Sequence, residues 1–300
     1  MTTLHAAPTR PQPPPPLRGL SVVVPTFNES ASIAAFLERT AQTLETVALE
    51  TQTLETLAPE SSAEPVGIVE IIVVDDDSPD GTADEAERCA RRLAIEVRVL
   101  RRSPPRSLSR SVLDGARCAR GDVLVVLDAD LSHDPRDIPR LVDPVVRAAA
   151  DVSIGSRYVS GGSTAGWSPR RRALSGLGTR CARLITRVRD PLSGFFALRR
   201  ELLTGNAEVA LRPVGFKILL EVLGRHAGLE VAEVPITFHE RARGTSKFGA
   251  RQGIEFLLQA FSLVAHRAIR RSLPPRDRGS RRPSRPSASI HNDSVLEIRS

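Results

Sequence analysis

The chain has 300 residues, 41% of them hydrophobic, which is enough for the core of one large domain or two modest ones. No stretch has the ~20 uninterrupted apolar residues that a membrane-spanning helix needs, and the N-terminal segment lacks the apolar centre of a secretory signal. The three cysteines, Cys89, Cys118 and Cys181, are too scattered for a disulfide framework or a CxxC metal site. The composition therefore predicts a cytoplasmic protein and argues against an integral membrane protein.

The formal net charge of +7 is carried by the two ends of the chain. Residues 266–300 contain nine arginines and three acidic residues, and residues 1–19 contain Arg10 and Arg18 with no acid. Because the segment between them is close to neutral, the charge does not indicate a nucleic-acid partner. We expect residues 1–19 to be a disordered, proline-rich lead and residues 272–300 to be a disordered basic tail.

The first half of the segment 20–271 alternates between apolar runs and amphipathic stretches. In chain order it predicts a strand at 20–24, a helix from about Ser30, a strand at 69–74, a helix at 82–93, a strand at 96–100, a helix at 110–119 and a strand at 123–127. The segment 45–64, with a Thr-Leu-Glu triplet at 53–55 that repeats the one at 43–45, indicates an extension of the first helix, then a loop. This order is typical of an α/β fold with a mostly parallel, doubly wound sheet and helices on both faces.

After about Ser160 the pattern becomes less regular. It predicts a Gly-rich loop, a helix at 171–187, a short strand near 194–198, a helix at 216–225 and a strand at 230–238. The last predicted helix, 254–269, has one apolar face formed by Ile254, Leu257, Leu258, Phe261, Val264, Ala265 and Ala268. It is too short and too polar to cross a bilayer, so this face either docks on the core or lies in a membrane interface.

Two carboxylates follow a buried strand directly, in the segment Leu127-Asp-Ala-Asp-Leu-Ser-His133. Alternate residues of extended chain share a face, so Asp128 and Asp130 can reach one ion or one diphosphate–metal complex. Oxygen ligands favour Mg²⁺ or Mn²⁺, and Ser132 and His133 offer weaker additional ligands. The alternative is a solvated turn, but ligands of open α/β sheets bind at this end of the strands.

A second acidic cluster, Asp75, Asp76 and Asp77, follows the strand at 69–74. These carboxylates can accept hydrogen bonds from a base or ribose, whereas helix capping by Asp80 or Thr82 explains part of the segment without a ligand. The first strand ends in Val24-Pro-Thr-Phe-Asn-Glu29. Because all three strand ends are expected at one edge of the sheet, they predict a shared site. No GxGxxG or P-loop sequence is present.

Motifs in this order identify a family resemblance over about residues 20–250. The chain resembles the inverting family-two glycosyltransferases of GT-A fold, specifically the polyprenol-phosphate (dolichol-phosphate) mannosyltransferases. Beyond the three strand ends, the resemblance rests on Gly155-Ser-Arg-Tyr158, Gly161-Gly, Gly166-Trp, Asp190-Pro-Leu-Ser-Gly-Phe195, Gly215-Phe-Lys-Ile-Leu-Leu-Glu221, Val234-Pro-Ile and Arg243-Gly-Thr-Ser-Lys247. It implies a nucleotide and metal half at 20–155, an acceptor half at 156–247 and a C-terminal amphipathic helix within 248–271.

The resemblance also implies roles for individual residues. The donor nucleotide would be held by Pro25, Phe27, Glu29, Asp75 and Asp76. Asp128, Ala129 and Asp130 would bind the donor diphosphate through Mg²⁺ or Mn²⁺, with Ser132 as a further metal ligand where several relatives carry Gln. Arg157, Arg171 and Ser175 would face the acceptor phosphate. A loop with Arg243, Ser246 and Lys247 would close on the donor, and the catalytic set would be Asp128, Asp130, Arg157, Arg243 and Lys247.

The second half of the chain lacks an unassigned acidic pair that could act as a base, and this absence also favours a phosphate acceptor. Transfer to a hydroxyl needs a carboxylate base, whereas a phosphomonoester with a second pKa of ~6 is already an anionic nucleophile. The second half offers no unassigned acidic pair, and Lys217 stands in the Gly-Phe-Lys segment instead. The expected reaction transfers mannose from GDP-mannose to a polyprenyl phosphate with inversion. Transfer of glucose or another hexose from a UDP-sugar to the same lipid stays open, as does a non-catalytic basic membrane or nucleic-acid adaptor.

The acceptor's long polyprenyl chain implies a membrane surface as partner. We expect a peripheral enzyme on the cytoplasmic face, bound either by the 254–269 helix with the basic tail or by a separate integral membrane protein.

Overall fold

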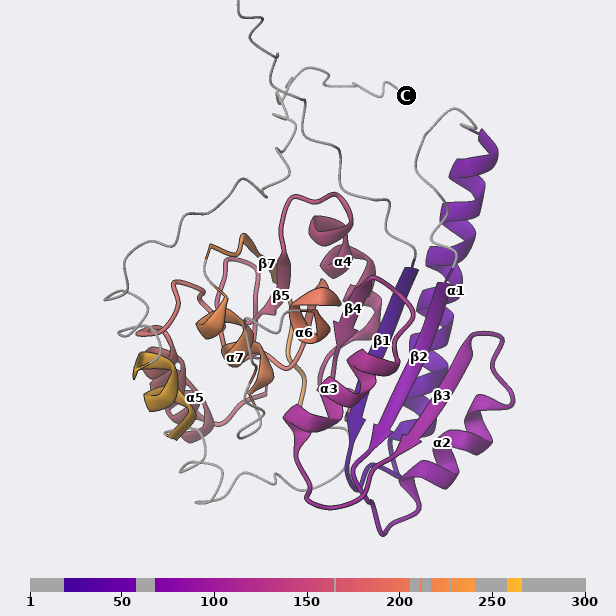
Figure 1. Cartoon of the computed structure of the whole chain (residues 1–300), viewed down its shortest axis with the longest axis horizontal. Helices are drawn as coiled ribbons and strands as arrows, with labels where there is room; N and C mark the ends of the chain where they lie inside the picture. Colours follow the sequence, from indigo (N-terminus) through magenta and orange to yellow (C-terminus); the bar gives the residue numbers. More distant parts are fainter. Residues whose placement is uncertain are drawn as a thin grey trace, which may run out of the picture. The chain divides into compact units, whose positions relative to one another are not determined.

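A seven-stranded sheet in the order β3-β2-β1-β4-β6-β5-β7 forms the centre of the fold (Figure 1). β6 runs antiparallel to β4 and β5, and the remaining neighbours pair in parallel. The computed structural model describes residues 19–57, 68–164, 166–205, 211, 217–226, 228–240 and 258–265. The strands are β1 Gly19–Thr26, β2 Ile68–Asp75, β3 Glu96–Arg101, β4 Val123–Val126, β5 Val152–Ser156, β6 Phe196–Arg199 and β7 Val231–Pro235.

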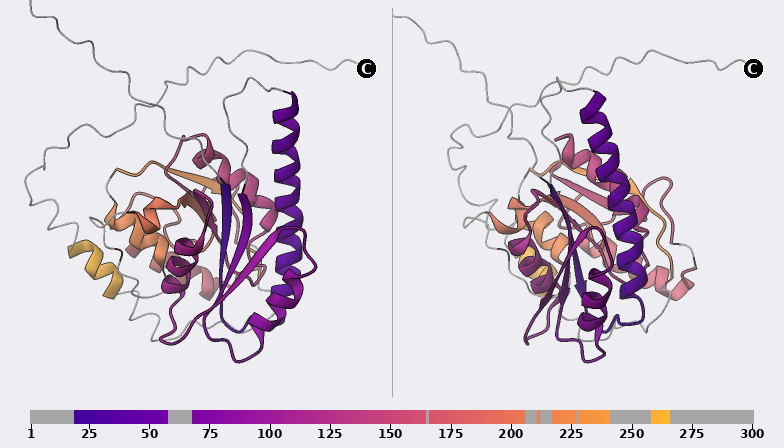
Figure 2. Two further views of the ribbon diagram at one scale, coloured as in Figure 1. Left: turned by 45° about the vertical axis from the view of Figure 1, so that its right-hand side comes forward. Right: turned by 90° about the vertical axis from the view of Figure 1, so that its right-hand side faces the viewer.

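Helices cover both faces of this sheet (Figure 2). One face buries residues of α1, α2 and α4 against β1 and β4, with Phe36 and Leu141 fully enclosed. The other face buries α3, α6 and α7, where Val112 and Leu219 pack on the sheet. The bounds are α1 Ile33–Leu57, α2 Thr82–Ala90, α3 Leu108–Cys118, η1 Pro135–Asp137, α4 Ile138–Val146, α5 Pro169–Ala182, α6 Glu201–Thr204 and α7 Ile218–Arg225, followed by a helix at 258–265.

The α/β fold with a mostly parallel, doubly wound sheet is confirmed. The helix extension through the Thr-Leu-Glu triplets is also present, since α1 continues to Leu57. The sequence analysis missed α4, β5 and α6, and it placed the end of α5 at 187 instead of Ala182. The predicted lead, the loop after α1 and the basic tail lie outside the described residues.

The helix at 258–265 docks through a different face from the one its apolar pattern suggested. Leu263 is fully buried in a cluster with Ala182, Ile185 and Leu220, and the Gln259 side chain donates to the carbonyl of Lys217 at 3.0 Å. The apolar face points outward instead, with Leu258 60%, Phe261 76% and Val264 47% exposed. None of the helices within the described residues is both long enough and apolar enough to cross a membrane.

A buried carboxylate joins the start of three strands. Glu70 of β2 is fully enclosed and accepts from the Ser21 hydroxyl at 2.7 Å and the Arg120 backbone N–H at 2.8 Å. The guanidinium of Arg98 lies 2.9 Å from the same carboxylate. Burial alone would raise the pKa of Glu70, but these hydrogen bonds and the charges of Arg98 and Arg120 lower it below its ordinary value.

We expect Glu70→Gln to lower the free energy of unfolding at pH 7 by roughly 2 to 3 kcal/mol, since the ionic hydrogen bonds are lost in a buried place. Because the folded pKa is depressed, the stabilisation is present above about pH 4.3 and is lost as the pH falls through the folded value. Urea unfolding at pH 7 and pH 4 measures both effects. Glu96→Gln, which removes a half-exposed partner of Arg120, should cost much less. Equal losses in the two variants would contradict this account.

Candidate active site

Three strand ends meet at one edge of the sheet, as the sequence predicted. β1 lies between β2 and β4, and Thr26 at its end is in register with Asp75. The backbone N–H of Asp76 donates to the Thr26 carbonyl at 2.9 Å, and that of Leu127 donates to Val23 at 3.4 Å. The segments after all three strands therefore begin side by side.

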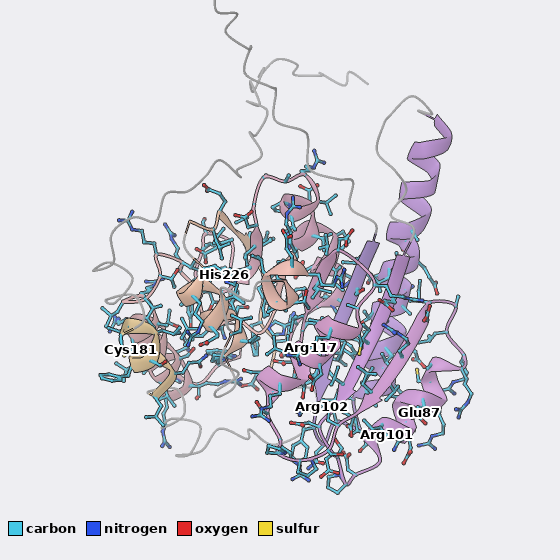
Figure 3. All side chains as sticks on the ribbon, viewed as in Figure 1. Glu87, Arg101, Arg102, Arg117, Cys181 and His226 are labelled. Atoms are coloured by element: carbon cyan, nitrogen blue, oxygen red, sulfur yellow. The ribbon has the colours of Figure 1, made fainter. Side chains whose placement is uncertain are left out.

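The carboxylates after β2 already have protein partners. Asp75 is buried and accepts from the Thr26 hydroxyl at 3.2 Å and the Ser78 N–H at 3.0 Å. Asp76 accepts from the Ser107 N–H at 2.6 Å and from the guanidinium of Arg102, which also holds Asp114 at 2.8 Å. Arg102 follows β3 and is labelled in Figure 3. These bonds order the loop that follows β2.

The segment after β1 presents an aromatic ring beside a cation. Pro25 is buried as part of β1, and Phe27 is partly exposed with the Arg106 guanidinium 4.5 Å from its ring centre. The Glu29 N–H donates to the Thr82 hydroxyl at 2.9 Å, which ties the start of α1 to the start of α2. The Phe27 ring at this edge of the sheet is thus partly exposed and lies beside a guanidinium.

The segment after β4 carries two carboxylates one residue apart. Asp128 is partly exposed, Ala129 and Asp130 are buried, and the Ser132 N–H donates to Asp130 at 3.0 Å. A Cβ on Gly194 would come within 2.9 Å of Asp128 Oδ2, so only glycine leaves room for that carboxylate. The buried Ser132 hydroxyl has no hydrogen-bond partner among the described residues.

This donor set fits a hard divalent cation. Among the described residues no three His, Cys, Asp or Glu side chains come together as a complete metal cage. Mg²⁺ is commonly held by only one or two carboxylates together with substrate phosphates and water, and Asp128 and Asp130 match that pattern. Ser132 adds an unused hydroxyl oxygen to the same segment.

A histidine and a lysine are enclosed next to the carboxylates. His133 packs against Phe195 and Phe238, with ring centres 5.3 and 5.0 Å away, and burial lowers its pKa to about 4. It is therefore neutral at pH 7. Lys217 donates to the Leu192 carbonyl at 3.0 Å, and burial followed by repulsion from Arg157 lowers its pKa to about 8.

Arg157 forms an ion pair with Asp190, a residue to which the sequence analysis assigned no role. Its Nε and Nη2 donate to Asp190 at 2.8 and 2.7 Å, and its backbone N–H donates to the same group at 3.0 Å. Asp190 is completely buried. Burial would lower the pKa of Arg157, but the bonds and charge of Asp190 raise it above its usual value. No described residue accepts from Nη1 of Arg157.

Two arginines share one aromatic platform. The guanidinium of Arg157 lies 5.3 and 5.5 Å from the ring centres of Trp167 and Phe238, and that of Arg171 lies 4.4 and 5.6 Å from the same rings. Trp167 and Phe238 meet edge to face at 5.2 Å. The structure thus brings Arg157 and Arg171 together.

Ser175, the third predicted acceptor residue, joins the same group through Tyr158. Its hydroxyl lies 2.9 Å from the Tyr158 hydroxyl, and the Tyr158 ring is 5.3 Å from the Arg157 guanidinium. The charge of Asp128 also acts on both Arg157 and Lys217, so the acidic and basic groups adjoin. The remaining predicted residues, Arg243, Ser246 and Lys247, lie outside the described residues.

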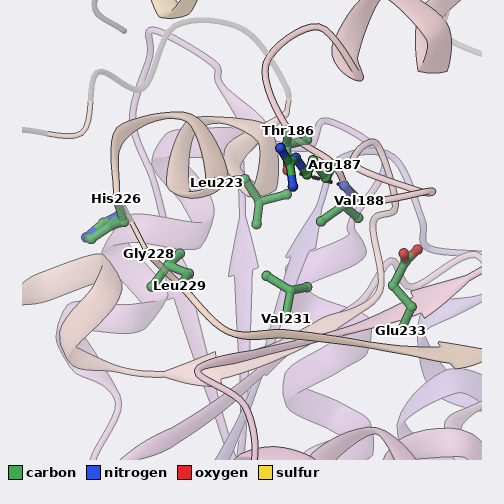
Figure 4. A pocket seen from close by; sticks show the side chains of 9 residues that line it. All are labelled: Thr186, Arg187, Val188, Leu223, His226, Gly228, Leu229, Val231 and Glu233. Atoms are coloured by element: carbon green, nitrogen blue, oxygen red, sulfur yellow. Dashed lines mark hydrogen bonds between the residues drawn. The ribbon is translucent and has the colours of Figure 1, made fainter. Parts of the chain in front are cut away.

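A pocket of about 310 Å³ lies apart from these residues (Figure 4). It is lined by Thr186, Arg187, Val188, Leu223, His226, Gly228, Leu229, Val231 and Glu233, none of them a predicted site residue. Glu233 accepts from the backbone N–H groups of Arg189 and Asp190 at 2.8 and 3.0 Å. The pocket wall therefore supports the loop that carries Asp190.

Comparison with known proteins matches residues 21–204 to the family model described as glycosyl transferase family 2. A dolichol-phosphate mannosyltransferase of Pyrococcus furiosus is 37% identical over 249 residues, which are 82% of this chain and 63% of that protein. This chain thus spans less than two thirds of that relative. A dolichol-phosphate mannosyltransferase of Saccharomyces cerevisiae is 34% identical, covering 80% of this chain and 84% of the yeast protein.

A polyprenol monophosphomannose synthase of Mycolicibacterium smegmatis is 40% identical over 186 residues, covering 60% of this chain and 70% of that protein. Among solved structures, glucosyl-3-phosphoglycerate synthase of Mycobacterium tuberculosis, in complex with Mn²⁺, UDP-glucose and phosphoglyceric acid, superposes with a TM-score of 0.54. It is 21% identical and covers 86% of this chain and 81% of its own, a likeness of fold.

The buried lysine can be titrated directly, because Lys217 and Lys247 are the only lysines in the chain. In a Lys247→Arg variant labelled at lysine Cε, the single NMR signal should titrate with a pKa of about 8 in the folded protein. The unfolded chain keeps this proton to about pH 10.4, so the free energy of unfolding should rise between about pH 8 and 10. A folded-state signal that titrates above pH 10 would disprove the enclosure of Lys217.

Proposed function

This chain belongs to glycosyl transferase family 2, and from that premise we propose that it transfers mannose from GDP-mannose to a polyprenyl phosphate, giving polyprenyl-phosphate mannose and GDP. The names of three relatives, two dolichol-phosphate mannosyltransferases and a polyprenol monophosphomannose synthase, support the sugar and the acceptor. As a glycosyltransferase the chain is an enzyme, which leaves the adaptor hypothesis without support. The observation that carries the proposal is the pair of arginines on one aromatic platform next to Asp128 and Asp130.

The acids on the acceptor side support a phosphate rather than a hydroxyl acceptor. Asp190 forms an ion pair with Arg157, and Glu221 forms one with Arg225. Glu233 accepts hydrogen bonds from backbone N–H groups. Each of these carboxylates is thus engaged by protein donors rather than directed at an acceptor hydroxyl. The nearest histidine, His133, is enclosed among aromatic rings. An acceptor phosphate brings its own negative charge and needs no base.

Asp128 and Asp130, with Ser132 beside them, are the residues that would hold a divalent cation, Mg²⁺ or Mn²⁺. When bound, the cation would supply positive charge to the donor diphosphate and so stabilise the departing GDP. On the donor side we assign Pro25, Phe27 and Glu29 to the face of the nucleotide, and Asp75 and Asp76 to the rim. Because Asp75 and Asp76 are engaged by protein donors, they would contribute mainly through their remaining lone pairs.

The acceptor-side residues would orient the nucleophile. Asp190 fixes the plane of the Arg157 guanidinium and leaves Nη1 for a phosphate oxygen. Arg171 would bind a second oxygen, and Ser175 would position the headgroup together with Tyr158. A phosphate oxygen then forms a bond to C1 of mannose while the bond from C1 to the diphosphate oxygen breaks. That electron pair leaves with GDP, and attack from the opposite side inverts C1.

The same proposal divides the chain into two working parts. Residues 20–155 would hold the donor and the cation, and residues 156–247 the acceptor, with Arg243, Ser246 and Lys247 completing the catalytic set around the donor. Residues 248–271 would supply the amphipathic helix. The enzyme would work on the cytoplasmic face of the membrane, where a water-soluble nucleotide sugar meets an acceptor in the bilayer. An integral membrane protein that recruits it stays the alternative to direct binding.

Transfer of labelled sugar to a short-chain, water-soluble prenyl phosphate tests the proposal. With Mn²⁺ present, GDP-mannose should support turnover and UDP-glucose should not. Asp128→Ala and Asp130→Ala should each reduce the rate by about 100-fold or more, because both carboxylates act where negative charge develops on the leaving group.

Asp143→Ala is the matched control, since it removes an exposed carboxylate of α4 that pairs only with Arg147. It should leave the rate unchanged. Turnover with UDP-glucose alone would replace the donor assignment, and near-normal rates in both site variants at saturating metal would overturn the site.

Arg171→Gln should lower kcat/KM for the prenyl phosphate by roughly 10- to 100-fold, because one ionic hydrogen bond to the phosphate is lost. Binding of GDP-mannose, measured by calorimetry, should stay within about twofold of wild type. Arg170→Gln is the control on the same helix, since this neighbouring arginine is exposed. A selective loss of GDP-mannose affinity in Arg171→Gln would move this arginine to the donor site.

A further inference from the structure

The single tryptophan of the chain carries a buried hydrogen-bond donor that has no partner among the described residues. Trp167 is 5% exposed, and its indole Nε1–H donates to no atom that the structure describes. The indole nitrogen can only donate, and a buried tryptophan usually places this group against an acceptor. The N–H of Trp167 therefore lacks an acceptor that the rest of the described chain does not supply.

Other unpartnered buried atoms lie close to this one. The Ser132 hydroxyl and Nδ1 of His133 also have no hydrogen-bond partner among the described residues. His133 and Trp167 both contact the ring of Phe238, at centroid distances of 5.0 and 5.2 Å. Because folded proteins leave few buried polar groups unsatisfied, a group of such atoms beside the candidate active site indicates a place that a ligand completes.

The backbone on both sides of Trp167 fixes the position of its ring. The Trp167 backbone N–H donates to the Thr164 carbonyl at 3.2 Å, and the Trp167 carbonyl accepts from Nε of Arg172 at 3.2 Å. The preceding Gly166 has a φ of 82°, in the left-handed region that favours glycine. The ring itself packs edge to face on Phe238. The indole N–H thus belongs to a fixed surface.

The charges around the ring favour an anion as the missing acceptor. The guanidinium of Arg171 lies 4.4 Å from the ring centre of Trp167, and that of Arg157 lies 5.3 Å away. Two cations against one ring repel a third cation and attract negative charge. The buried carboxylate of this region, Asp190, is already paired with Arg157. An anion from solution is therefore the partner that fits both the cations and the indole donor.

We propose that the indole N–H of Trp167 donates a hydrogen bond to the phosphomonoester of the acceptor, which makes this tryptophan a further acceptor-binding residue. The inference rests on the proposed function for the identity of the acceptor. Its phosphate oxygens would be held by the two arginines and by one neutral donor. A neutral donor orients an oxygen but binds it less strongly than a third cation would, so it leaves more negative charge on the nucleophile.

Two other roles of Trp167 predict different behaviour. If the ring only packs against Arg157 and Arg171, removal of the N–H alone should change nothing. If the N–H binds the donor diphosphate, GDP-mannose should affect it and the acceptor should not. A test must therefore follow the N–H itself and compare the two substrates.

NMR of the full chain can follow this N–H directly, because protein labelled with ¹⁵N-tryptophan gives a single indole signal. Saturation with a short-chain, water-soluble prenyl phosphate should move the signal downfield, as a hydrogen bond to an anionic oxygen does. Inorganic phosphate should move it in the same direction but only at higher concentration, since it lacks the prenyl chain. GDP-mannose with Mg²⁺ should leave it unchanged. The inference is overturned if prenyl phosphate leaves the signal in place, if inorganic phosphate alone moves it, or if GDP-mannose moves it.

Variants test whether the N–H contributes to acceptor binding. Trp167→Phe keeps an aromatic ring and should lower kcat/KM for the prenyl phosphate about 10-fold, mainly through KM, because one hydrogen bond to a charged group is lost. Affinity for GDP-mannose should stay within about twofold of wild type.

The matched control for packing replaces the single tryptophan by benzothienylalanine, which keeps the bicyclic shape and has sulfur in place of the N–H. It should show the same loss as Trp167→Phe, and it keeps the test available if the smaller ring destabilises the fold. Wild-type kinetics with this analogue would overturn the inference. If prenyl phosphate moves the indole signal but wild type transfers no mannose, the proposed function fails and the phosphate contact of Trp167 stands.

Discussion

Asp190 has no access to water, and burying a carboxylate is costly unless it is paired and hydrogen-bonded. Arg157 supplies three of them, from its backbone N–H and two guanidinium nitrogens. Glu233 of β7 in turn holds the backbone of residues 189 and 190. The pair therefore joins the end of β5, the loop before β6 and the neighbouring strand β7. The basic side of the site takes its geometry from this pair, because removal of one partner from a buried ion pair typically costs about 3 to 5 kcal/mol.

The same neutralisation shapes the acidic side. Arg102 is shared between Asp76 and Asp114, and Asp75 is capped by Thr26 and the backbone of Ser78. These bonds balance much of the charge that three successive aspartates would otherwise concentrate after β2. Asp128, which is partly exposed, and the buried Asp130 follow β4 and offer the carboxylate oxygens that a hard cation favours. Carboxylates after β2 thus order their own loop, whereas those after β4 are the ones we propose as cation ligands.

Local pattern was enough to predict most of the sheet and the place of the site. The strands β1, β2 and β4 are rich in Val, Ile and Leu, and their parallel order brings their polar ends together. α4 was missed because Pro139 and Pro144 interrupt its helical pattern, although its buried Leu141 and Val145 hold it on the sheet. β5 is a short strand with Ser and Gly, so its period was weak. Asp190 is 33 positions from Arg157, and no local signal connects two such residues.

α5 shows how one helix can serve two environments. Its inward stripe carries Arg171 and Ser175 toward the aromatic platform and then Thr179 and Ala182 into the core. Its outward stripe exposes leucines, and its flanks expose arginines that no described carboxylate neutralises. An ordinary surface helix has one apolar face toward the core and one polar face toward water. α5 departs from this pattern, because small and polar residues face inward and leucines face outward. In α5 the inner stripe therefore serves the site and the core, and the apolar side chains on its outer side stay exposed.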